Sequence, residues 1–277
     1  MRLRINRAIV GYPLAGIAML FVFLYLRFPG EALTDYVKAY VAGRYPGATL
    51  SIDTIQPSFP PGFALSDITV GLRDRPDPIF RADGLTIRPG GLALLSGRLA
   101  IVAKAAGYGG EARGWVEFSR PFSLQGPLTA AADIRDLRID KWAWLRELFN
   151  RQITGALKGS IAFSGTAGAL KNGIGTVDFT LTNGTYPLQE SFLGLEKIDY
   201  SRVEGKASFR NGALKITQLT LTGDKLRCSL KGNILLADDF QASQIDLNGT
   251  IELPLMGNKR LTLAISGTVG KPQSRIM

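Results

Sequence analysis

Residues 245–253 read IDLNGTIEL, and residues 261–269 read LTLAISGTV. In both stretches every odd-numbered position is apolar or glycine, whereas the even-numbered positions are mostly polar. A period of two is typical of a strand with one apolar and one solvated face, as antiparallel sheets have. The same alternation recurs from about residue 48 onward, so the sequence predicts a mainly β protein with an antiparallel sheet.

A seven-residue pattern recurs within these predicted strands. An apolar residue is followed by glycine at the third position, an apolar residue at the fifth and a bulky one at the seventh; the last copy is shorter. The glycines of the six copies are Gly114, Gly159, Gly205, Gly232, Gly249 and Gly267. A glycine inside a strand marks a bend, a bulge or a close approach of backbones. Because each glycine shares the face of the apolar residues, we expect a sheet that curves around its apolar face.

Turn signals separate the predicted strands. The pairs Asn183-Gly184 and Asn211-Gly212 are of the kind that closes tight hairpins. Both are therefore predicted to be turns.

Two segments have helical rather than alternating spacing. Residues 31–42 repeat apolar side chains every three to four positions, and Gly43 follows as a stop signal. This helix either caps one end of the β structure or is an ordinary juxtamembrane amphipathic helix. Residues 139–152 place Trp142 and Leu145 at helical spacing. We expect this second helix to plug or flank the sheet, or to pack as a crossover between its halves.

The N-terminus differs from everything that follows. Arg2, Arg4 and Arg7 precede residues 8–26, a run of 19 residues without a charged side chain, and Arg27 closes the run. As a helix this run would span about 28 Å, which matches a bilayer hydrocarbon core of about 30 Å. The three preceding arginines are topology-setting, because positive charge favours the cytoplasmic side. The sequence thus predicts a single transmembrane helix with a cytoplasmic N-terminus.

A cleavable signal peptide is the alternative to an anchor. Its apolar region is usually about 7–15 residues long and ends at a site of small residues, which residues 26–30 do not offer. We therefore expect residues 1–28 to form a cytoplasmic tip and anchor in the bacterial inner membrane. Residues 29–45 would be a juxtamembrane amphipathic helix. Residues 46–277 would be a curved β domain in the periplasm, with its helical insertion near 139–152.

The composition excludes several kinds of chemistry. The chain has no histidine and one cysteine, Cys228, so it lacks the commonest general base and the ligands of a structural zinc site. No catalytic motif is present, and the sequence predicts neither an enzyme nor a bound cofactor or metal. The formal charge of +10 includes the three topology-setting arginines, and the rest is dispersed. A basic domain beside anionic lipid head groups is favoured over a nucleic-acid partner.

Several short motifs resemble known bacterial envelope proteins. Residues 11–14 (GYPL), 25–29 (YLRFP) and 57–63 (PSFPPGF) resemble the type II secretion system protein N family. The glycine-containing strands and residues 266–272 (SGTVGKP) are similar to the AsmA-like repeats. The resemblance implies a membrane-anchored, periplasmic and non-catalytic accessory of the type II secretion system, with other secretion subunits as partners. It also implies a grooved sheet, shaped like a taco or half-barrel, of the type thought to hold lipid.

Two functions therefore stand side by side. The first is the accessory role in protein secretion, with inner-membrane lipids and secretion subunits as partners. The alternative is a lipid-binding or lipid-transfer protein that uses an apolar β groove, with phospholipid as its bound molecule. The residues predicted to line that groove are Leu157, Ile161, Phe163, Leu230, Ile234, Leu247, Ile251, Leu261, Leu263 and Ile265.

Overall fold

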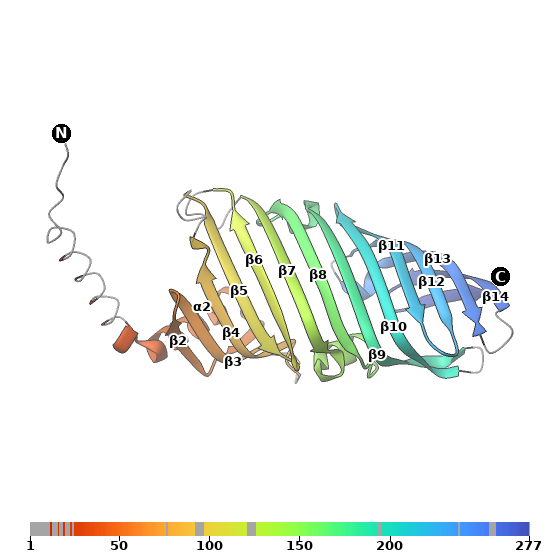
Figure 1. Ribbon diagram of the computed structural model, residues 1–277, viewed down its shortest axis with the longest axis horizontal. Coiled ribbons are helices and arrows are strands. Elements are labelled where there is room, and N and C mark those ends of the chain that lie inside the picture. Colours follow the sequence, from red (N-terminus) through yellow and green to blue (C-terminus); the bar gives the residue numbers. More distant parts are fainter. Residues whose placement is uncertain are drawn as a thin grey trace.

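The computed structural model describes residues 12, 16, 19, 23, 25–75, 77–91, 97–120, 126–192, 195–237, 239–254 and 259–276. Within these residues fifteen strands form one open antiparallel sheet that curves toward its C-terminal end (Figure 1). The predicted mainly β class with a curved antiparallel sheet is confirmed. The strands are β1 (Ala48–Ser51), β2 (Thr54–Ser58), β3 (Gly62–Leu72), β4 (Phe80–Pro89), β5 (Leu99–Gly107), β6 (Gly110–Phe118), β7 (Pro127–Arg138), β8 (Ala156–Thr166), β9 (Ile174–Phe192), β10 (Leu195–Arg210), β11 (Ala213–Thr222), β12 (Arg227–Leu235), β13 (Gln244–Leu253), β14 (Lys259–Thr268) and β15 (Pro272–Ile276).

The strand order is that of a long meander. From β4 to β15 each strand pairs with the one before it in the chain, whereas β1 and β2 pair with different halves of β3. Neighbouring strands are therefore neighbours in sequence as well. Such an arrangement needs only short connections, in agreement with the frequent turn signals.

Two α-helices accompany the sheet in the described part of the chain. Helix α2 (Gly30–Arg44) is the first predicted helix, extended by a residue or two at each end. The second is shorter than predicted: a 3-10 turn, η1 (Ile139–Lys141), precedes α4 (Ala143–Phe149). The prediction of one helix to residue 152 was wrong, because Asn150 adopts a left-handed conformation with φ 49° and ends the helix. Two further 3-10 turns are η2 (Leu170–Asn172) and η3 (Phe240–Ala242).

The strand register gathers the apolar side chains on one continuous side of the sheet, called here the apolar face. One row of cross-strand partners runs from β5 to β14 without interruption. Its members are Ala103, Gly114, Ala132, Ile161, Val177, Ala207, Ile216, Gly232, Leu247 and Ile265. The neighbouring row, which points to the other side, begins with Lys104, Arg113, Asp133, Ser160 and Asp178. The sheet thus has one apolar and one polar side along its length.

The repeat glycines lie on the apolar face at points where a neighbouring strand comes unusually close. A Cβ added at Gly159 would lie 2.7 Å from the carbonyl oxygen of Asp178. At Gly205 it would overlap the ring of Phe179, which lies over that glycine from the adjacent strand. At Gly249 it would overlap the carbonyl oxygen of Ser229. At Gly159 and Gly249 glycine is required because a side chain would push adjacent strands apart, and at Gly205 a side chain would displace the Phe179 ring.

The two predicted Asn-Gly turns have different outcomes. Asn211 and Gly212 have φ values of 49° and 76° and close the β10–β11 hairpin, so this turn is confirmed. Asn183 and Gly184 lie inside β9, and that prediction was wrong. Asn183 has φ 52° but the pairing with β10 continues on both sides of it. Gly184 leaves room there for the ring of Tyr200.

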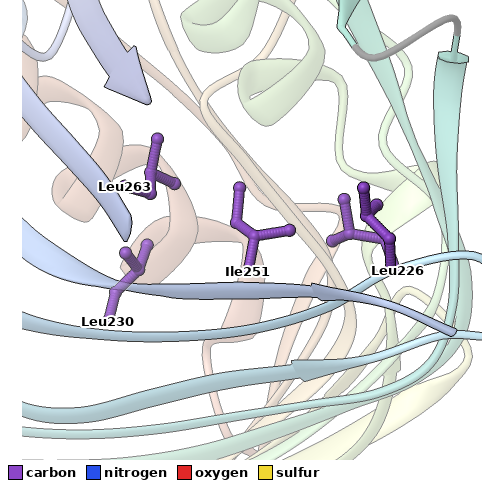
Figure 2. Packing of buried hydrophobic residues seen from close by; sticks show 5 residues of the cluster. Leu226, Leu230, Ile251 and Leu263 are labelled. Atoms are coloured by element: carbon purple, nitrogen blue, oxygen red, sulfur yellow. The ribbon is translucent and has the colours of Figure 1, made fainter. Parts of the chain in front are cut away.

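Two clusters of buried side chains lie on the apolar face near opposite ends of the sheet. The N-terminal cluster contains Ile52, Ile55, Ile68 and Ala82, with residues of α2 packed against it. The C-terminal cluster contains Leu226, Leu230, Ile251, Leu253 and Leu263. Figure 2 shows its labelled side chains projecting from their strands into a common space. Each end of the sheet therefore has its own core.

The predicted membrane anchor gains no support from the structure. Among the residues that are described, no helix combines the length and the apolar character needed to cross a bilayer. Arg2, Arg4, Arg7 and most of residues 8–26 lie outside the described residues. The anchor and its orientation stay predictions.

Candidate functional site

In the described part of the chain, no second layer covers the stretch of the apolar face between the two buried clusters. Its described side chains are only partly buried, apart from Phe118 and Leu128 at one edge and Tyr200 of β10. Ile161, near its middle, keeps 41% of its surface exposed. The partly buried side chains of this stretch are Ile101, Ala103, Ala105, Ala112, Val116, Ala130, Ala132, Ile134, Leu137, Leu157, Phe163, Val177, Phe179, Leu181, Val203, Ala207 and Phe209. We refer to this stretch, from β5 to β10, as the uncovered apolar face.

One part of the uncovered apolar face is hollowed. A depression of about 380 Å³ is lined by Ile161, Phe163, Val177, Phe209 and other residues of β8 to β11. The rings of Phe163 and Phe209 lie 6.4 Å apart, centroid to centroid. Aromatic and aliphatic side chains make up most of the lining, to which Lys171 of η2 and Thr176 of β9 also belong. Along those apolar side chains the depression offers a ligand contact by burial and dispersion.

The remainder of the uncovered apolar face has a floor of small residues. On β5, β6 and β7 the inward positions include Ala103, Ala105, Gly114, Ala130 and Ala132. Small side chains leave the backbone close to the surface of the face and create space above it. A floor of small apolar side chains suits a flexible apolar chain better than a rigid, polar small molecule.

The ten residues predicted to line a groove all lie on the apolar face, but in two different environments. Leu157, Ile161 and Phe163 of β8 belong to the uncovered part. Five others belong to the C-terminal cluster. Leu230, Ile251 and Leu263 are buried members of it, and the partly buried Leu261 and Ile265 pack against it. Leu247 is also buried, whereas Ile234 is half-buried near the end of β12.

Several residues of the uncovered apolar face were missed by sequence reasoning. Val177 and Phe179 follow the same alternation as the predicted set and could have been included. The alanines of β5 to β7 were missed because alternation is judged by large apolar side chains, and alanine does not mark a face. Only the register with β8 shows that Ala132 lies beside Ile161.

One rim of the apolar face is built by the segment between β7 and β8. Trp142 stacks on Tyr108 with ring centroids 5.7 Å apart, and its Nε1 donates a hydrogen bond of 2.8 Å to the carbonyl oxygen of Ile79. Arg146 forms an ion pair of 3.2 Å with Asp77 of the β3–β4 connection. Burial of the Tyr108 ring is the main cause of its raised pKa. These contacts fix the segment across the ends of several strands.

The two halves of the sheet approach each other at this rim. A hollow of about 390 Å³ is lined on one side by Arg75, Trp144 and Glu147, and on the other by residues 239–241, which include the first two residues of η3. Arg75 and Glu147 form an ion pair of 3.2 Å. The connection between β12 and β13 therefore lies opposite α4, because the sheet curls along its length.

The polar side of the sheet has ordinary surface electrostatics. Lys104 and Arg113 lie 3.1 Å and 3.0 Å from the carboxylate of Glu111, and their hydrogen bonds lower the pKa of that carboxyl group. On the apolar face, burial raises the pKa of the Cys228 thiol to about 11. That thiol stays protonated at neutral pH. Among the described residues no group of His, Cys, Asp and Glu side chains could hold a metal ion.

Comparisons with known proteins give no family. No protein-family model matches this chain, and neither a curated protein nor a solved structure does. The resemblance to the type II secretion system protein N family and to AsmA-like repeats therefore stays a prediction, as does the accessory role in secretion that it implies.

Proposed function

We propose that this protein binds the acyl chains of lipids on its uncovered apolar face, as a lipid-binding or lipid-transfer protein of the bacterial envelope. The observation that carries the proposal is the lack of a second layer over β5 to β10. A sheet normally buries its apolar face against helices or another sheet. Here α2 and α4 lie toward one end and one rim, so the middle of the face has no partner among the residues that the structure describes.

The exposed area supports a ligand or partner for that face. The chain exposes 18450 Å² at a mass of 29.9 kDa, whereas a compact monomer of that mass exposes about 11,700 Å². Even if the first 28 residues are allotted the roughly 4,800 Å² of an unfolded segment, the remainder exposes about 3,000 Å² more than a compact domain. This excess is total area and comes from both sides of the open sheet, the uncovered apolar face being one of them. Exposed apolar patches larger than a few hundred Å² usually mark a binding surface.

The dimensions fit lipid chains. From β5 to β10 there are five strand spacings, which amount to about 24 Å, while one bilayer leaflet contributes about 15 Å of hydrocarbon. Each methylene transferred from water to an apolar surface gains about 0.8 kcal/mol. An acyl chain laid along the face would therefore be held well in an aqueous compartment.

The buried clusters limit how far such a chain extends. Ile52, Ile55 and Ile68 fill one end, and Leu230 and Ile251 fill the other. A lipid would be held between these ends. We therefore propose that the face accommodates the acyl chains of one or a few lipid molecules.

Two adjacent alanines of β7 provide a matched test. Ala132 is on the apolar face beside Ile161, whereas Ala131 is on the polar side beside Trp115. We expect Ala132→Glu to lose bound lipid because acyl chains do not tolerate an unpaired carboxylate. Ala131→Glu introduces the same charge on the solvated side and should not change binding.

The measurement is the lipid retained per protein after purification of the full chain in detergent, by extraction and mass spectrometry. The amount of lipid that merely surrounds the apolar run of residues 8–26 should be the same in all variants, so it does not affect the difference between them. The expected result is a several-fold lower lipid content for Ala132→Glu, with equal circular dichroism spectra. Equal lipid content in wild type and both variants would overturn the proposal.

A further inference from the structure

The tip of the hairpin formed by β2 and β3 carries an unusually exposed aromatic side chain. Phe59 exposes 87% of its surface, more than any other large hydrophobic residue in the described part of the chain. Pro60 and Pro61 follow it, and both are exposed. The tip therefore presents a stiff apolar projection that packs against little of the described part of the chain.

The tip is fixed next to the end of the N-terminal apolar run. The ring centroids of Phe28 and Phe63 are 5.9 Å apart. Helix α2 begins at Gly30, whose Cα lies so close to the carbonyl oxygen of Ile55 that no side chain would fit. The buried Thr34 hydroxyl donates a hydrogen bond of 2.8 Å to the Gly30 carbonyl oxygen. Since residues 8–26 lead directly into this junction, the hairpin tip stays close to the point where that run ends.

A guanidinium group lies beside the tip on the polar side of the sheet. Gly62 is paired with Ser58 across the hairpin, and a Cβ at Gly62 would lie 2.6 Å from Cγ of Arg88. The glycine thus lets the Arg88 side chain lie across β3 toward the tip. There its Nη2 donates a hydrogen bond of 3.3 Å to the Phe59 carbonyl oxygen.

The polar groups at this position have unused hydrogen-bonding capacity. Nε of Arg88 and Oγ of Ser58 are buried and make no hydrogen bond. A guanidinium has five N–H donors in a planar fork that matches the oxygens of a phosphate. Because Nε is buried, an anion at the tip would bind through the outer N–H groups of this guanidinium.

We infer that residues 58–62 contact the lipid bilayer surface beside the N-terminal run, with Phe59 in the interfacial layer and Arg88 at the level of the lipid phosphates. Aromatic rings favour that layer, and basic side chains favour anionic head groups. The 19 uncharged residues of the preceding run and the net charge of +10 favour a bilayer over a protein partner. This contact does not depend on lipid binding by the uncovered apolar face.

The test places a fluorescent probe at the tip of the full-length protein. In a Cys228→Ala background, Phe59→Cys is labelled with an environment-sensitive NBD group, and the protein is reconstituted into vesicles of phosphatidylcholine and phosphatidylglycerol. Asp224→Cys, in the exposed β11–β12 turn, is the matched control. Doxyl-labelled lipid should quench the probe at position 59 at least twofold more than at position 224. Equal quenching at the two positions would overturn the inference.

A second comparison tests the phosphate contact. Arg88→Gln should halve, or more than halve, the extra quenching that anionic lipid produces at position 59. Arg113→Gln removes an exposed arginine elsewhere on the polar side and should have no effect. If the two substitutions act alike, Arg88 does not bind lipid phosphate.

Discussion

Replacing Gly249 by alanine is the most direct perturbation of the curved sheet. Gly249 of β13 lies between Leu230 of β12 and Leu263 of β14, inside the C-terminal cluster. The added Cβ would overlap the carbonyl oxygen of Ser229 and lie 2.8 Å from Cα of Leu230. Both are backbone atoms within the strand ladder, so neither can rotate out of the way. The β12–β13 pair would have to separate locally.

The size of the effect follows from this geometry. Overpacking of a core costs about 1–3 kcal/mol and sometimes more, and the loss of ladder contacts adds to it, so we expect about 2–4 kcal/mol. For a chain of this length that lowers the melting temperature by about 3–7 °C. Gly47 is the control: nothing lies within 4 Å of its added Cβ, and its φ is accessible to any residue. Gly47→Ala should stabilise slightly, by about 0.4–1 kcal/mol.

The assay is thermal unfolding of the full chain in detergent, followed by circular dichroism. Gly249→Ala should melt well below the wild type, and Gly47→Ala at or slightly above it. A Gly249→Ala protein that melts within 1 °C of the wild type would refute the packing explanation for the repeat glycines. A loss of similar size at Gly47 would show that any Gly→Ala change is harmful.

Three further predictions use the same unfolding measurement. Ile251 is 1% exposed, so Ile251→Ala should lower the free energy of unfolding by about 3–4 kcal/mol. The control Ile276→Ala, at a residue that is 39% exposed, should lower it by under about 0.5 kcal/mol. Equal losses of stability would contradict the assignment of the core. Tyr200→Phe removes a hydrogen bond of 2.5 Å to the carbonyl oxygen of Thr154 and should cost about 1–2 kcal/mol of stability. An unchanged melting temperature would disprove this prediction. Burial raises the pKa of Cys228 from 9.0 to about 11, so the unfolded chain loses this proton at lower pH than the folded one. Stability should therefore fall as pH rises from 9 to 11, and Cys228→Ala should make that fall shallower; an unchanged slope would argue against burial of the thiol.

Much of the sheet could be predicted from the sequence because alternation is a local property. The odd positions of residues 245–253 and 261–269 do share one face, and the observed register pairs them directly. A meander of neighbouring strands also makes local turn signals informative, as at Asn211-Gly212.

Features that depend on distant parts of the chain could not be predicted in the same way. Asn183-Gly184 has the composition of a turn, but the long β10 strand pairs across it and keeps it within β9. Likewise, the sequence places Leu157 and Leu263 on the same face but does not show that the first is partly exposed while the second is buried. That difference arises because the C-terminal strands curl together, which no local pattern encodes.

The central claim is that the uncovered apolar face holds acyl chains, and site-specific photocrosslinking in cells tests it most directly. A photoreactive amino acid is placed at Ile161 on the apolar face or at Val102 on the polar side, which are 41% and 45% exposed. Phospholipid adducts at Ile161 and their absence at Val102 are the predicted result. Adducts at neither position, or equally at both, would contradict the account.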